Sequence, residues 1–157
     1  MTRIPGLLAT GLGVAALLGS LAASADTPGR HPRYLHARSD LRLAQRLLDV
    51  HDEPNVMHHV HRVREHVLRA IHEIDRAAVL DHKDIDDHPR SDANLDRPGR
   101  FSKVMALLVS ARNDIDREED NPSAVGWRNV AHREIAAAMD QLRKAAQDLR
   151  MDRLEGF

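Results

Sequence analysis

We predict an all-α fold, an antiparallel four-helix bundle made of two helical hairpins. In four segments of the chain, apolar residues recur every three or four positions, which is the spacing of one helix face. The alternation of apolar and polar residues that marks a strand is missing from the sequence. Short acidic turns containing proline separate the first segment from the second and the third from the fourth. Because short turns join antiparallel neighbours, two hairpins are expected, and each must bury its apolar stripes against the other.

The first 25 residues are predicted to be an export signal that is cleaved off, so that the mature protein does not contain it. Arg3 is followed by a largely apolar stretch over residues 6–21, and Ala23, Ser24 and Ala25 form a small-residue cleavage site. A membrane anchor is the alternative, but several glycines interrupt the apolar stretch. We therefore expect one domain, residues 26–157, in a periplasmic or secreted protein. No later stretch is apolar enough to span a membrane.

Composition excludes several classes of function. The chain has no cysteine, which excludes disulfides, thiolate chemistry and Cys-ligated iron–sulfur clusters. Without Arg3, the mature chain carries 22 Lys and Arg against 24 Asp and Glu, a net charge of −2 with neutral histidines. This balance gives no basis for binding nucleic acid. Protonation of all 11 histidines would change the net charge to +9, so mild acid could alter stability or partner choice. The alternative, which we favour, is that the histidines titrate in solvent with no consequence.

The first hairpin is expected to contain helices over residues 32–50 and 56–80. Pro54 lies in the break between them, where it cannot continue the first helix. The inner stripe of the first helix is Tyr34, Ala37, Leu41, Ala44 and Leu48. The inner stripe of the second is Val56, Val60, Val63, Val67, Ala70, Ile71, Ile74 and Ala78.

The second hairpin is expected to contain helices over residues 99–119 and 122–154. Asn121 is predicted to be the N-cap of the last helix and Pro122 its first residue. The stripe of the third helix is Phe101, Val104, Leu108, Ala111 and Ile115, and that of the fourth is Ala131, Ile135, Ala138, Leu142, Ala145 and Leu149. Residues 84–99 connect the hairpins; they either cross over the bundle or stay at one end.

Two groups of residues are candidate ligands for a divalent transition metal. His58, His61 and Glu65 lie three and four positions apart, so their side chains can converge on one side of the second helix. Imidazole and carboxylate ligands suit Zn²⁺, Cu²⁺ or Ni²⁺. His82 and His88, in the connection, form the second group. The alternative for both groups is a set of solvated histidines on an exposed surface.

Aspartates crowd residues 81–96, and clustered carboxylates in a loop can bind Ca²⁺. The spacing does not fit an EF-hand, because no start in this loop places a glycine at position six and a glutamate at twelve. Helix capping and turns made by Asp side chains explain the same residues, and we favour that explanation.

The sequence favours a non-enzymatic protein. It has no nucleophile with a plausible base and no glycine-rich phosphate loop. We therefore predict a small exported helical bundle that acts as a binding or scaffold module, through a protein partner or through self-association. The alternative is a periplasmic, His-rich protein that binds a transition metal.

Overall fold

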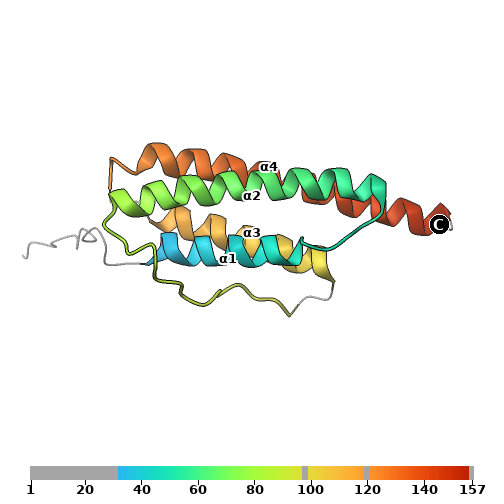
Figure 1. Ribbon diagram of the computed structural model, residues 1–157, viewed down its shortest axis with the longest axis horizontal. Coiled ribbons are helices and arrows are strands. Elements are labelled where there is room, and N and C mark those ends of the chain that lie inside the picture. The colour runs from blue at the N-terminus through green and yellow to red at the C-terminus, as the bar shows by residue number, and fades with distance from the viewer. Residues whose placement is uncertain (1–31, 97–98, 119–120, 156–157) are drawn as a thin grey trace, which may run out of the picture.

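The computed structural model describes residues 32–96, 99–118 and 121–155, and within these ranges it contains four helices and no strand. The helices are α1 (Arg33–Leu47), α2 (Pro54–Leu80), α3 (Arg100–Arg117) and α4 (Val125–Glu155) (Figure 1). The predicted all-α four-helix bundle is confirmed. The predicted export signal lies outside the described residues. None of the described helices combines the length and the apolar character needed to cross a membrane.

The four helices form a square in which α1 and α4 occupy opposite corners. Helix α1 contacts α2 and α3, and α4 also contacts α2 and α3. Helices α2 and α4 are antiparallel, because His59 pairs with Gln141 while His66, further along α2, pairs with Glu134, earlier in α4. Figure 1 shows opposite chain directions for the other contacting pairs as well. Each contact in the bundle is therefore antiparallel.

The connection from α2 to α3 is a crossover that runs the length of the bundle, so α2 and α3 point in the same direction (Figure 1). Arg38 of α1 holds its first part, donating a hydrogen bond to the carbonyl of Ile85. The carbonyl of Arg90 lies 3.2 Å from Nδ1 of His36, also on α1. The crossover brings the end of α2 beside the start of α4, which is the arrangement of bundles with one long connection.

The core is built from the predicted stripes and is rich in alanine and valine. Alanines on all four helices are fully buried, and such small side chains let helix axes approach closely. In α2 the predicted stripe is buried except for Ile71, which is half-buried, and Ala77 is buried as well. Phe101 and Leu149, at the edges of their stripes, are also only half-buried. The sequence periodicity thus identifies most of the core, but it misses Leu107, which is fully buried in the core cluster.

The prediction that Pro122 is the first residue of α4 is wrong by three residues. Residues 122–124 form a turn, and α4 begins at Val125. Asn121 stabilises this turn: its side-chain oxygen accepts a hydrogen bond from the Ser123 amide at 3.0 Å, and its carbonyl accepts one from the Ala124 amide at 3.0 Å. The Asn121 side-chain amide donates to the carbonyl of Leu80 at 2.9 Å, which ties the turn to the end of α2.

Helix α2 ends in a Schellman motif with His82 in the left-handed conformation. The Lys83 amide donates to the Ala78 carbonyl and the His82 amide to the Val79 carbonyl. His82 has φ = +57°, a conformation that glycine adopts without strain and other residues adopt rarely.

His82→Gly is therefore expected to raise the free energy of unfolding by about 0.5–1 kcal/mol, the relief of strain less the greater chain entropy of glycine. Urea unfolding of the two proteins measures this. His72→Gly is the matched control, because His72 lies inside α2, where glycine should lower stability by about 1 kcal/mol. A loss of stability in both variants would contradict the role given to His82.

A buried ion cluster joins the end of α2 to the end of α3. Nζ of Lys83 lies 3.0 Å from a carboxylate oxygen of Asp81 and 2.8 Å from one of Glu118. Burial alone would lower the pKa of Lys83, but the two carboxylates raise it above its ordinary value. Glu118 also accepts a hydrogen bond from the Arg33 amide at 3.0 Å, and its carbonyl accepts one from the Tyr34 hydroxyl at 3.3 Å. The cluster thus fixes the start of α1 and the start of the crossover against α3.

Candidate functional site

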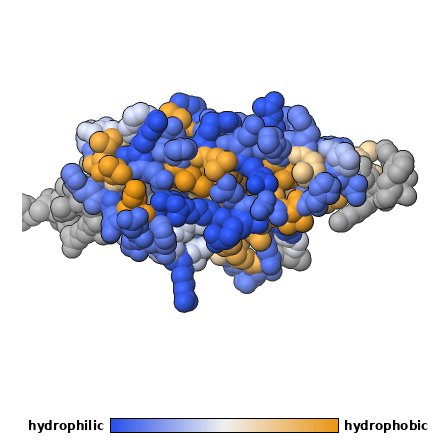
Figure 2. Space-filling model, viewed as in Figure 1, coloured by the Kyte–Doolittle hydropathy of each residue, from blue (hydrophilic) through white to orange (hydrophobic). Residues whose placement is uncertain are grey.

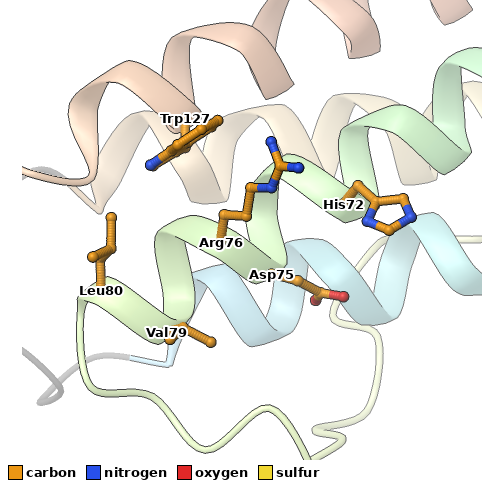
Figure 3. Close-up of a pocket in the computed structure, with 6 residues that line it drawn as sticks. All are labelled: His72, Asp75, Arg76, Val79, Leu80 and Trp127. Atoms are coloured by element: carbon orange, nitrogen blue, oxygen red, sulfur yellow. The ribbon is translucent and has the colours of Figure 1, made fainter.

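An open groove lies between the last two turns of α2 and the start of α4. Its volume is about 460 Å³, and its apolar surface comes from Val79, Leu80 and Trp127 (Figure 3). Val79 is 56% exposed and Leu80 is 41% exposed, so two large aliphatic side chains lie side by side in the chain at the surface. We call this feature the Trp127 groove; it is lined by His72, Asp75, Arg76, Val79, Leu80 and Trp127.

Two charged side chains of the Trp127 groove already have partners within the bundle. The guanidinium of Arg76 lies over the Trp127 ring, 4.7 Å from its centroid, and 3.4 Å from a carboxylate oxygen of Glu73. Asp75 forms an ion pair with Arg38 at 2.6 Å. Because these charges are paired, the groove offers a ligand mainly apolar contact, from Val79, Leu80 and Trp127.

The groove is a consequence of the crossover. Because α2 ends where α4 begins, Val79 and Leu80 line the same groove as Trp127; Leu80 points toward the Trp127 side and Val79 lies on the side of α2 away from the ring (Figures 1 and 3). The bond from Asn121 to the Leu80 carbonyl holds the two helix ends together. Figure 2 shows apolar surface near this end of the bundle, within a surface that is mostly hydrophilic.

The structure brings two of the three predicted metal ligands on α2 together. Nε2 of His61 lies 3.2 Å from a carboxylate oxygen of Glu65, and the other oxygen of Glu65 lies 3.6 Å from Arg62. His58 is exposed and packs its ring edge-on against His59, with centroids 5.3 Å apart. His58, His61 and Glu65 do not form one of the compact groups of three possible ligands found in the described part of the chain. Metal binding by this set stays a prediction.

The structure places His82 and His88 in different surroundings. His82 is the exposed residue that ends α2. Nδ1 of His88 lies 3.3 Å from Arg38 and 3.5 Å from Arg42. Two guanidinium groups next to an imidazole disfavour a cation there. Metal binding by His82 and His88 likewise stays a prediction.

Two histidines of α2 form polar links to α4. His59 lies 2.9 Å from the Gln141 side chain, and His66 lies 2.7 Å from Glu134, which also accepts a hydrogen bond from Arg69 at 2.9 Å. Burial acts to raise the pKa of Glu134, but the bonds from His66 and Arg69 outweigh it and lower that pKa. These side chains connect helices at the edge of the core.

A cluster of three aspartates, which the sequence did not reveal, joins the crossover to α1 and α3. Asp40 of α1, Asp92 of the crossover and Asp114 of α3 each place a carboxylate oxygen within 4.8 Å of the others. Asp40 is 0% exposed and Asp114 is 5% exposed, whereas Asp92 faces solvent. Burial raises the pKa of Asp40, and burial together with the neighbouring carboxylates raises the pKa of Asp114 to about 6.

The positions of Asp40 and Asp114 in the sequence could have indicated part of this cluster. Asp40 follows Ala37 by three positions and precedes Ala44 by four, and Asp114 follows Ala111 by three. Both acids therefore fall on faces that point inward. Asp92, by contrast, is one of many aspartates in the crossover, and nothing in its sequence context distinguishes it.

No protein family, no characterised protein and no solved structure was found to match this chain. The fold itself defines the class of protein, which is an all-α four-helix bundle with one crossover connection.

Proposed function

We propose that this protein is a non-enzymatic binding module that acts outside the cytoplasm and holds a protein partner in the Trp127 groove. The occupant is an apolar side chain of that partner, packed against Val79, Leu80 and Trp127. The observation that carries the proposal is the grouping of these three exposed or half-buried apolar side chains around one cavity.

The chemistry of the groove supports this choice of occupant. Tryptophan and arginine are, with tyrosine, the residues enriched among those that dominate the energy of protein interfaces. Here the arginine is held over the tryptophan and bonded to Glu73, so both are ordered before a partner arrives. Ordering in advance lowers the entropy cost of binding. With Arg76 and Asp75 already paired, an apolar group is the best complement.

Photo-crosslinking in the native host tests the proposal. A benzophenone amino acid at position 79 should form a covalent adduct with one partner, whereas the same group at exposed position 68 should not. The partner identified in this way is then purified and its affinity measured. Val79→Asp should weaken binding at least about tenfold, because it puts a charge into an apolar contact.

Leu68→Asp is the matched control for the affinity measurement. Leu68 is exposed on the same helix, and 11 residues of helix place it about 16 Å from Val79 on nearly the same side. Equal loss of affinity in both variants, or in neither, would count against the Trp127 groove. A dimer in light scattering that Val79→Asp dissociates would instead identify a second copy of this chain as the occupant and overturn the choice of a separate partner.

Export is part of the proposal and rests on the sequence alone. We propose that residues 1–25 direct the protein out of the cytoplasm and are removed after Ala25. Mass spectrometry of protein from the periplasm or medium should give the mass of residues 26–157. The full-length mass in a cytoplasmic fraction would contradict export.

A second candidate function is transition-metal binding through the His61–Glu65 pair, favoured by its separation of 3.2 Å. Calorimetric titration with Zn²⁺, Cu²⁺ and Ni²⁺ tests this function, with His61→Ala as the variant. Binding that His61→Ala abolishes supports the function; binding of equal strength in both proteins excludes this site.

A further inference from the structure

We propose that Asp40, Asp92 and Asp114 form a binding site for a calcium ion, which joins the crossover to α1 and α3. This site is independent of the Trp127 groove, since it shares none of the residues that line it. The three carboxylates come from three separate parts of the chain. A bound ion would therefore fix the path of the crossover between α2 and α3.

The first support is that buried carboxylate oxygens of the cluster lack hydrogen-bond donors in normal geometry. Asp40 is fully inaccessible to solvent, and within the described part of the chain neither of its oxygens makes such a bond, although the Ser91 and Ser110 hydroxyls lie near it. One oxygen of Asp114 is buried and unpartnered in the same way. Buried carboxylates without partners are costly, and pairing with a cation removes that cost.

The second support is that the nearest positive charges do not neutralise the cluster. Arg33 approaches Asp114 only to 4.0 Å. His36 lies near enough to lower the pKa of Asp40 and Asp114, but its Nδ1 is directed at the Arg90 carbonyl. In the part of the chain that the structure describes, one distant guanidinium and one imidazole are thus the positive groups beside three carboxylates. A divalent cation between them supplies the missing charge.

The third support is the type and number of ligand atoms. The hydroxyls of Ser91 and Ser110 lie close enough to Asp40 to affect its pKa, and Ser110 donates to Asp92 at 3.1 Å. The site therefore offers oxygen atoms from three carboxylates and two hydroxyls. Hard cations select oxygen ligands, and Ca²⁺ takes six to eight of them, whereas Mg²⁺ commonly uses one or two carboxylates and keeps its waters. This set favours Ca²⁺ over Mg²⁺.

The ion can reach the site from solvent. Asp92 and Ser110 line a surface cavity of about 630 Å³ between the crossover and α3. Asp92 is exposed, so water can complete the coordination on that side.

Calorimetric titration of the purified protein with CaCl₂ tests the site, with MgCl₂ and ZnCl₂ as comparisons. We expect one Ca²⁺ per chain with a dissociation constant of about 1 mM or tighter, and weaker binding of Mg²⁺. Asp114→Asn and Asp92→Asn should each weaken Ca²⁺ binding at least about tenfold. Ca²⁺ should also raise the melting temperature of the wild type and not that of Asp114→Asn.

Two features of the design keep the test decisive. Asp114→Asn keeps the shape of the side chain and removes repulsion between carboxylates, and Asp92→Asn changes an exposed loop residue, so both variants should fold. Asp116→Asn is the matched control, because Asp116 is exposed on the same helix two residues away and should not affect binding. No Ca²⁺ binding at 5 to 10 mM ion, equal binding by all four proteins, or tighter binding of Mg²⁺ or Zn²⁺ would each overturn the proposal.

Discussion

Glu118→Ala is expected to lower the free energy of unfolding by about 3–5 kcal/mol. The substitution leaves the Lys83 ammonium buried with Asp81 as its one remaining carboxylate partner in the cluster. Lys83 and Glu118 are both almost inaccessible, and their charged atoms lie 2.8 Å apart. The substitution also removes the acceptor for the Arg33 amide at the start of α1. Urea unfolding at pH 7, followed by circular dichroism at the helix band, measures the change.

Glu118→Gln should cost less than Glu118→Ala, since its amide oxygen can still accept hydrogen bonds from Lys83 and Arg33. Glu65→Ala is the matched control at an exposed ion pair on α2, and we expect a change within about 0.5 kcal/mol. If Glu118→Ala were no more destabilising than Glu65→Ala, the ion cluster would not hold α1, α3 and the crossover together.

Leu108→Ala is expected to lower the free energy of unfolding by about 2–5 kcal/mol, the usual cost of a cavity in a packed core. Leu108 is fully buried on α3 and belongs to the core cluster that all four helices share. Because the core contains many alanines and valines, few large side chains are available to fill the space. Urea unfolding again gives the measurement.

The same substitution at an exposed leucine provides the comparison. Leu68→Ala removes the same atoms from the surface of α2, and we expect a change within about 0.5 kcal/mol. Similar losses at Leu68 and Leu108 would mean that α3 does not contribute to a common core.

The helices could be predicted from the sequence because each apolar stripe is a local pattern. Tyr34, Ala37 and Leu41 lie three and four positions apart, and all three are buried. The path of the crossover could not be predicted in this way. It depends on contacts between distant residues, such as the bond from Arg38 to the Ile85 carbonyl, for which the sequence gives no spacing rule. The start of α4 was missed because Asn121 stabilises a turn before the helix begins.

The candidate sites also differ in whether a local sequence pattern could predict them. The approach of His61 to Glu65 was predictable, because helical geometry brings residues four positions apart together. The Trp127 groove and the aspartate cluster were not predictable, because each combines residues from segments that only the crossover places side by side. Asp40 and Asp114 could be recognised as inward-facing acids, but their meeting with Asp92 required the three-dimensional fold.

The crossover is the feature on which both proposed sites depend, and fluorescence energy transfer tests it directly. The chain has one tryptophan and no cysteine, so a single engineered cysteine can carry an acceptor dye for Trp127. Residues 58 and 79 are both exposed on α2 and lie about 32 Å apart along it. We expect strong quenching of Trp127 by the dye on Val79→Cys and weak quenching by the dye on His58→Cys. The reverse order would place the start of α4 beside the start of α2 and would contradict the crossover.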